Sequence, residues 1–198
     1  MRQTAHMLLF ALLSCLTLVH GCAYSIYDDQ RLMDTQSSDK ALASNIKAAL
    51  LKSSFSEGWD ISVYCYYGHV FLVGQAPDAM RRKAVVIAER HNPISVTAHW
   101  FPSAAKHGSD FSTGARLRTA LIGTKGLAST RVDTEVNAGR AVLLGVVADE
   151  HERQIAVRAA RHVEGITSVT SYLLLPQKAG RKTRATPATV PGTAPERP

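Results

Sequence analysis

Few residues of this 198-residue chain have the types and spacing that catalysis or metal binding requires. The eight histidines show neither a His-Glu-x-x-His pattern nor a Cys/His ligand spacing. The segment 123–126, Gly-Thr-Lys-Gly, lacks P-loop spacing and follows a predicted helix, so we interpret it as a helix C-terminus. Cys65 lies on one face of an alternating strand, where we expect a buried thiol. The sequence therefore predicts that the protein is not an enzyme and uses no metal or cofactor.

Cys22 points to a different kind of chemistry. A basic start and an apolar run precede it, and residues 18–22 resemble a bacterial lipobox, although a small or β-branched residue is usual where His20 stands. This pattern predicts a signal peptide over residues 1–21 and lipid attachment at Cys22. Ala23 resembles the signal for transport onward to the outer membrane. The alternative is an ordinary cleaved signal peptide in which the cysteine is incidental.

Arg118, Ile122 and Lys125 form the candidate binding site. The helical spacing of Leu117 and Leu121 turns these two leucines toward the core, which places Arg118 and Ile122 on the flank at 100° per residue. Lys125 follows just past the helix end. Cations beside an apolar side chain suit an anionic phospholipid surface, where each basic group contributes ~1 kcal/mol. The alternative is that they are ordinary solvated cations beside a partly covered isoleucine.

The sequence segments that position these residues occur twice in the chain, as a tandem repeat. The glycine spacing of residues 68–74 recurs at residues 139–145, and an ungapped comparison aligns the flanking segments as well. A repeat of this length exceeds that of solenoid units, so each copy should be a small domain with its own core. In the first copy the positions that correspond to the candidate site are less basic: Lys47, Leu51 and Ser54.

Each copy contains the periods of two helices and three strands. Four aspartates stand where helix N-caps are expected: Asp39, Asp78, Asp110 and Asp149. The predicted strands are 60–66, 69–75 and 94–101, then 130–136, 140–146 and 166–175. The second helix should make a right-handed crossover between strands two and three. We predict an α+β fold of two tandem αββαβ domains, each a mixed three-stranded sheet with two helices on one face. The predicted cores contain Ile46, Leu50, Val70, Leu72, Leu117, Leu121 and Leu143.

This order of elements, the Gly-x-Val-x-Leu-x-Gly pattern at residues 68–74 and the closing Gly-Ile-Thr-Ser-Val at 165–169 resemble the BON domain of bacterial envelope proteins. Together with the lipobox, they make the chain similar to the dual-BON outer-membrane lipoproteins of the DolP type. Ala141 and the pair Asn92-Pro93 depart from the family pattern. The resemblance implies a non-catalytic module that binds phospholipid and helps to maintain the envelope under osmotic or other stress.

The composition changes at the edges of the two copies. The predicted segments are 22–38 as lipidated N-terminus and tether, 39–101 as the first domain, 102–109 as linker, 110–175 as the second domain and 176–198 as a disordered basic tail. The chain has a net charge of +7, and the tail carries five Lys and Arg residues against the single Glu196. Much of the positive charge therefore belongs to the tail.

Besides an enzyme, for which no catalytic constellation stands out, two classes of function remain open. The first is an outer-membrane lipoprotein, facing the periplasm, whose domains bind anionic phospholipid. The second is a periplasmic scaffold that docks onto another envelope protein through its sheet faces. Nucleic acid is not an expected partner, because an exported protein seldom meets it and the charge lies mainly in the tail.

Overall fold

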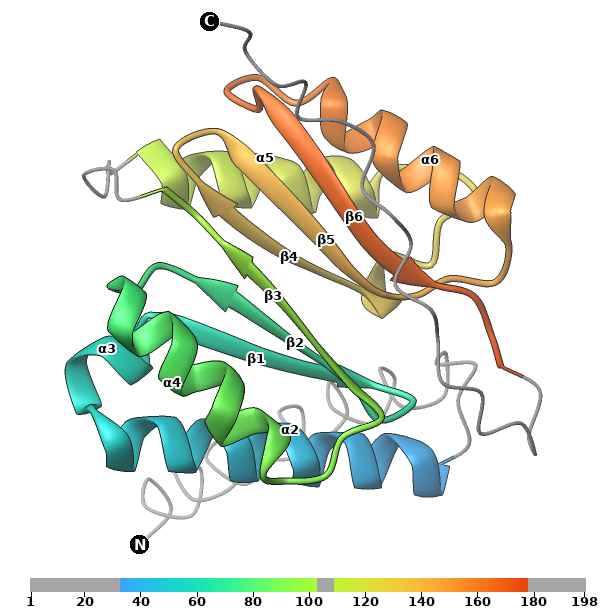
Figure 1. Ribbon diagram of the computed structural model, residues 1–198. Coiled ribbons are helices and arrows are strands. Elements are labelled where there is room, and N and C mark those ends of the chain that lie inside the picture. Colours follow the sequence, from blue (N-terminus) through green and yellow to red (C-terminus); the bar gives the residue numbers. More distant parts are fainter. Residues whose placement is uncertain (1–32, 103–108, 178–198) are drawn as a thin grey trace, which may run out of the picture.

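The computed structural model describes residues 33–102 and 109–177. The predicted signal peptide, Cys22 with the tether up to residue 32, and the tail from residue 178 onward lie outside the described residues. The described residues form two domains that use the same elements in the same order (Figure 1).

The two domains confirm the predicted αββαβ order. The first consists of α2 (Met33–Ser53), α3 (Phe55–Trp59), β1 (Ile61–Tyr66), β2 (His69–Gly74), α4 (Asp78–Glu89) and β3 (Ser95–Trp100). The second consists of α5 (Ser109–Ile122), the 3-10 turn η1 (Ser129–Arg131), β4 (Val132–Asn137), β5 (Arg140–Val146), α6 (Glu150–Arg161) and β6 (Ser168–Leu174). Each sheet is mixed: β1 pairs with β2 and β4 with β5 antiparallel, whereas β3 and β6 run parallel to β2 and β5. The short helix α3 is the one addition to the predicted pattern of the first domain.

Both hairpins use two-residue loops in which both residues have positive φ. The values are 55° and 76° for Tyr67 and Gly68, and 47° and 74° for Ala138 and Gly139. Positive φ at both central residues is the geometry that matches the right-handed twist of hairpin strands. A Cβ at Gly139 would lie 2.7 Å from the Gly165 carbonyl oxygen, so a side chain does not fit there. The predicted turns at the two glycines are confirmed.

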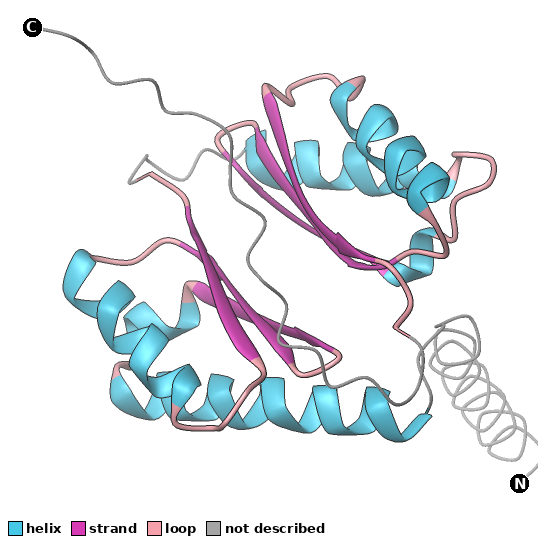
Figure 2. Ribbon diagram, turned by 45° about the vertical axis from the view of Figure 1, so that its right-hand side comes forward, coloured by secondary structure: helices cyan, strands magenta, loops and turns pink. Residues whose placement is uncertain are grey.

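Helices cover one face of each sheet, with α2 and α4 on the first and α5 and α6 on the second (Figures 1 and 2). The predicted core residues are all buried between these layers, each at most 2% exposed: Ile46, Leu50, Val70, Leu72, Leu117, Leu121 and Leu143. Cys65 also belongs to this core, which confirms the expected buried thiol.

The other faces of the two sheets pack against each other. Figure 2 shows the two sheets between two outer layers of helices. The contact is an apolar cluster of buried residues: Tyr66, Phe71, Val73, Phe101, Val142, Leu144 and Val146. This packing explains why β2 and β5 are apolar on both faces. It also contradicts the expectation that a partner docks through the sheet faces, because each domain already covers the sheet face of the other.

The predicted helix caps are correct for one aspartate of four. Asp149 is the N-cap of α6, where its carboxylate accepts a hydrogen bond from the Glu152 N–H at 2.8 Å. The other three predictions are wrong: Asp78 is the first residue of α4 after Pro77, Asp110 lies inside the first turn of α5, and Asp39 lies well inside α2. Because α2 begins at Met33, the end of the predicted tether is helical.

Candidate functional site

Helix α5 places two of the three predicted site residues side by side. Leu117 and Leu121 are buried in the core, which turns Arg118 and Ile122 outward, and 66% of Ile122 is exposed. Arg118 and Ile122 line one shallow hollow of about 80 Å³, beside η1 and the start of β4. Lys125 is exposed in the turn after the helix, outside this hollow. The structure thus joins Arg118 with Ile122 and leaves Lys125 as a neighbouring cation.

Phe111 extends the same flank and was missed by the sequence reasoning. It is 87% exposed, the highest value among the exposed large apolar residues of the described chain. Phe111 precedes Arg118 by two helical turns, so the two side chains lie in nearly the same direction from the helix axis. The seven-residue spacing of Phe111 and Arg118 is a signal in the sequence, but the pattern of core-facing residues in this helix does not include Phe111. We refer to Phe111, Arg118 and Ile122 as the α5 flank.

The Gly123–Gly126 segment ends the helix, as predicted. The Gly123 N–H donates to the Thr119 carbonyl at 3.0 Å, and the Thr124 hydroxyl donates to the Ala120 carbonyl at 2.6 Å. These bonds satisfy carbonyl groups of the last helical turn, which otherwise lack partners. The segment therefore serves as a helix C-terminus and positions Lys125 beyond it.

In the first domain the corresponding flank of α2 is occupied by α3. The Lys47 ammonium, which corresponds to Arg118, donates to the carbonyl oxygens of Gly58, Trp59 and Ile61 at 2.8, 3.0 and 2.7 Å. Burial lowers the pKa of Lys47, partly offset by the Asp60 carboxylate. Lys47 is thus committed to holding α3 and the start of β1, so it is not available to an outside ligand.

Helix α3 carries an exposed aromatic pair. Phe55 and Trp59 are 71% and 64% exposed, and their ring centroids are 6.0 Å apart. The Lys47 ammonium lies 5.9 Å from the centroid of the Trp59 ring. Large exposed aromatic side chains are costly in water and mark contact surfaces when they gather.

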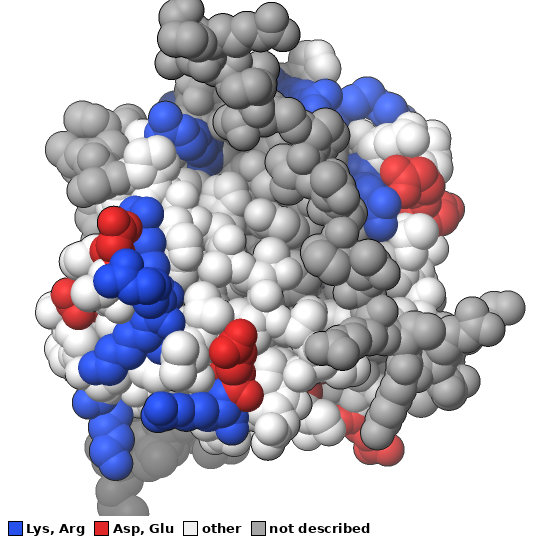
Figure 3. Space-filling view, in the orientation of Figure 1, with Lys and Arg blue, Asp and Glu red and all other residues white. Residues whose placement is uncertain are grey.

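A cationic groove lies between α2 and α4, on the other flank of α2. Lys52, Lys83, Arg90 and His91 line it around an apolar floor of Ala49 and Ile87, with a volume of about 370 Å³. Figure 3 shows Lys and Arg side chains as a band over α4. No acidic side chain lines the groove within the described part of the chain. An anionic group in the groove would therefore meet cationic side chains and no negative charge that repels it.

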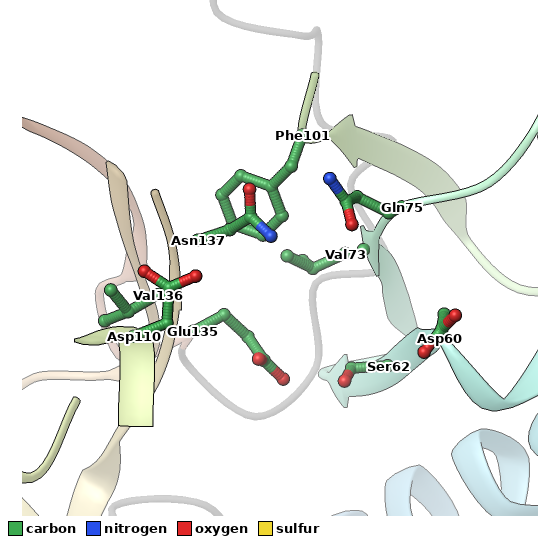
Figure 4. A pocket seen from close by; sticks show the side chains of 10 residues that line it. Asp60, Ser62, Val73, Gln75, Phe101, Asp110, Glu135, Val136 and Asn137 are labelled. Carbon is green, nitrogen blue, oxygen red and sulfur yellow. The ribbon is translucent and has the colours of Figure 1, made fainter. Parts of the chain in front are cut away.

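A polar cavity of about 310 Å³ lies where the two sheets meet at one end. Figure 4 shows the Glu135 carboxylate and the amides of Gln75 and Asn137 projecting between the sheets. The Tyr64 hydroxyl donates to Glu135 at 2.6 Å, and burial together with this carboxylate raises the pKa of Tyr64. Carboxylates, amides and the Ser62 hydroxyl line the cavity, so both domains offer hydrogen-bonding groups to it.

Two further observations concern the described residues. Among residues 33–102 and 109–177, no group of three or more His, Cys, Asp or Glu side chains is arranged to hold a metal ion. In the same part of the chain, no helix is both long enough and apolar enough to cross a bilayer.

Comparisons with known proteins bear on the fold. The family model described as BON domain matches residues 38–96 and 109–176, together more than half of the chain. Two solved structures of CdsD, a structural protein of the type III secretion system of Chlamydia trachomatis, also match. Its C-terminal domain is 17% identical, with coverage of 70% of this chain and 67% of that chain and a TM-score of 0.31. The second structure is 16% identical, with coverage of 69% and 63% and a TM-score of 0.30.

Proposed function

Because the chain belongs to the family of BON-domain proteins, known for phospholipid or membrane association and generally non-catalytic, we propose that it is an outer-membrane lipoprotein that contacts anionic phospholipid. The contact is made by the second domain through Arg118, Ile122 and Lys125, with Phe111 beside them. The protein faces the periplasm and helps to maintain the envelope under stress.

The observation that carries this proposal is the exposed α5 flank. Two cations, Arg118 and Lys125, contribute ~1 kcal/mol each near an anionic surface. Partial burial of Ile122 adds at most ~2 kcal/mol. A few kcal/mol is weak for a protein in bulk solution, but it is enough to enrich a membrane-anchored protein in anionic regions of the bilayer.

The anchor in this proposal is the lipidated Cys22. A lipoprotein carries several acyl chains, and more than one chain is needed for stable anchoring. We expect Cys22→Ala to abolish the incorporation of radioactive palmitate and to leave the precursor uncut at this site. A Cys22→Ala chain that is processed like the wild type would contradict lipidation.

Vesicle flotation tests the α5 contact. The basic tail could attract anionic lipid without any folded site, so the chain is shortened to end at Pro176. We expect this chain to float with phosphatidylglycerol vesicles, and Arg118→Glu, Ile122→Asp and Lys125→Glu combined to abolish flotation. Raised salt should weaken the interaction, because it screens exposed charges.

The matched control changes the same charge elsewhere in the second domain. Arg158 and Arg161 are exposed on α6, away from the α5 flank. Arg158→Glu with Arg161→Glu should reduce flotation much less than Arg118→Glu with Lys125→Glu. Equal loss in both pairs would assign binding to net charge alone.

Docking onto another envelope protein remains the alternative function, and the cationic groove is the observation that favours it. A groove lined by Lys52, Lys83 and Arg90 and free of acids fits an acidic segment of a partner. In that case Lys83→Glu with Arg90→Glu would abolish cross-linking to an envelope protein and leave flotation unchanged.

A further inference from the structure

Of the eight exposed large apolar residues of the described chain, five lie on one side of the molecule. The eight are Met33, Phe55, Trp59, Val86, Ile94, Phe111, Ile122 and Leu175. Met33 lies on the same flank of α2 as Lys47, two heptads earlier, and Phe55 and Trp59 belong to α3, which packs on that flank. Phe111 and Ile122 belong to the corresponding flank of α5. We call the surface of these five residues the β1/β4 side.

The two flanks lie on one side because the edge strands β1 and β4 lie against each other. Each is an edge strand of its sheet. The Tyr64 and Tyr66 hydroxyls of β1 donate to Glu135 and Asp133 of β4 at 2.6 and 2.5 Å. Helix α3 leads directly into β1, and the hollow beside Arg118 and Ile122 is lined by residues of β4. Both surfaces therefore border the same edge of the double sheet (Figure 1).

The structure of α3 fixes the direction of its aromatic pair. Gly58 packs against α2 so closely that a Cβ would lie 2.7 Å from the Leu50 carbonyl carbon. Phe55 and Trp59 are four residues apart and share the face of α3 that points away from α2. Glu57, midway between them, points to the opposite side of the helix. The exposed part of α3 thus carries both aromatic rings, together with the exposed Ser56.

Building on the proposed α5 contact, we propose that Phe55 and Trp59 enter the boundary between headgroups and acyl chains of the same bilayer. In this orientation the β1/β4 edge of the double sheet faces the membrane, and both domains contact it. A tryptophan with an apolar body and a polar N–H is suited to this boundary.

Charge on the β1/β4 side favours a bilayer as the occupant. Lys40 lies on the flank of α2 between Met33 and Lys47, and it is exposed like Arg118 and Lys125. Cations from both domains thus lie near the exposed apolar groups, with the exposed Asp60 next to α3 as an acidic neighbour. This combination of basic and apolar side chains is typical of surfaces that lie in the interface of an anionic membrane.

Tryptophan fluorescence tests the position of α3 directly. The chain contains two tryptophans, so Trp100→Phe leaves Trp59 as the only emitter. The full chain with this substitution is mixed with phosphatidylglycerol vesicles whose acyl chains carry bromine, a contact quencher. We expect the Trp59 emission to shift to shorter wavelength and to be quenched. Because the readout is local, the basic tail does not contribute to it.

A second variant, in the chain with both tryptophans, guards against misfolding of Trp100→Phe. Phe55→Ser removes an exposed side chain, so the fold should persist. At raised salt, which screens the tail, its vesicle partitioning should fall about tenfold through the loss of one inserted aromatic group. Val86→Ser, an exposed apolar residue on α4, is the matched control and should partition like the wild type.

The outcomes separate this proposal from the α5 contact. If the protein floats but bromine does not quench Trp59, α3 stays outside the bilayer and the α5 contact stands. Equal partitioning of Phe55→Ser and the wild type overturns the α3 contact in the same way, as does binding of α3 to a protein in place of lipid. If the wild type does not float, both contacts are wrong.

Discussion

Asp39 is buried inside a helix, yet its carboxylate holds the turn of a hairpin in the same domain. It is 3% exposed and accepts hydrogen bonds from the Tyr67 and Gly68 N–H groups, each at 2.8 Å. The Cys65 thiol also donates to it, at 3.3 Å. The sequence suggested a helix N-cap at Asp39, because an N-cap and a buried acceptor for backbone N–H groups call for the same residue type. Only the position of the hairpin distinguishes the two roles.

Asp39→Asn should lower the free energy of unfolding by ~2 kcal/mol. The substitution replaces an ionised acceptor with a neutral amide whose NH2 group faces two N–H donors, and hydrogen bonds to charged groups contribute about 1.5–3 kcal/mol. Urea unfolding followed by circular dichroism measures the change. Asp110→Asn, the same substitution at the corresponding position of the second domain, should cost much less. Similar losses in the two variants would refute the role assigned to Asp39.

At the scale of elements, strands and long helices were predictable and α3 was not. The predicted strand 140–146 coincides with β5, since its apolar residues all face packed layers. Helix α3 is short, and its two aromatic residues point to solvent, so it has no apolar period directed at the core. Phe111 was not predicted for the same reason, because its side chain points to solvent. Patterns that assume burial of apolar residues miss exposed ones such as Phe55, Trp59 and Phe111.

The docking of α3 on α2 depends on Gly58, and this dependence can be measured. Gly58→Ala should destabilise the first domain by ~1–3 kcal/mol, because the added methyl group overlaps backbone atoms of Leu50. In Gly114→Ala the nearest neighbour is a Val136 methyl group at 4.0 Å, so the more favourable helix propensity of alanine should stabilise α5 by ~0.5–1 kcal/mol. Thermal unfolding of both variants measures these changes in stability. A neutral Gly58→Ala would mean that α3 is not anchored as described.

At the scale of the whole molecule, the packing of sheet on sheet makes one folding unit of two small domains. The sequence showed β2 and β5 as apolar on both faces, which is correct, and suggested that the domains would support each other. It could not show which faces meet. Each of these strands has two apolar faces that look alike in the sequence. Which face packs against the other sheet depends on which face the helices cover.

The interface between the sheets should make stability depend on pH. Burial lowers the pKa of His99, which lies 3.2 Å from the Tyr172 hydroxyl of the other domain. Below the unfolded pKa of ~6.5 the unfolded chain binds a proton that the folded chain does not, so the free energy of unfolding should fall as pH drops. Burial lowers the pKa of His69 as well, which adds to the effect.

Thermal unfolding between pH 7.5 and pH 5 measures this dependence. His99→Phe removes the titrating group and keeps an aromatic ring against Phe101 and Tyr172, so its melting temperature should vary less with pH. His151→Gln, at an exposed position on α6, is the control and should retain the wild-type slope. A slope that His99→Phe leaves unchanged would assign the effect to other groups.

The contact between Tyr64 and Glu135 joins corresponding positions of the two copies, because the residue numbers differ by the repeat length. Tyr66 likewise meets Asp133, the counterpart of Ser62, so the two strands cross with near two-fold symmetry. A symmetric contact of this kind is the self-complementary interface of a homodimer. The present chain is thus built like a dimer whose subunits became joined by gene duplication. Halves that are joined in one chain need not stay alike, and here the first contains α3 where the second has the turn η1.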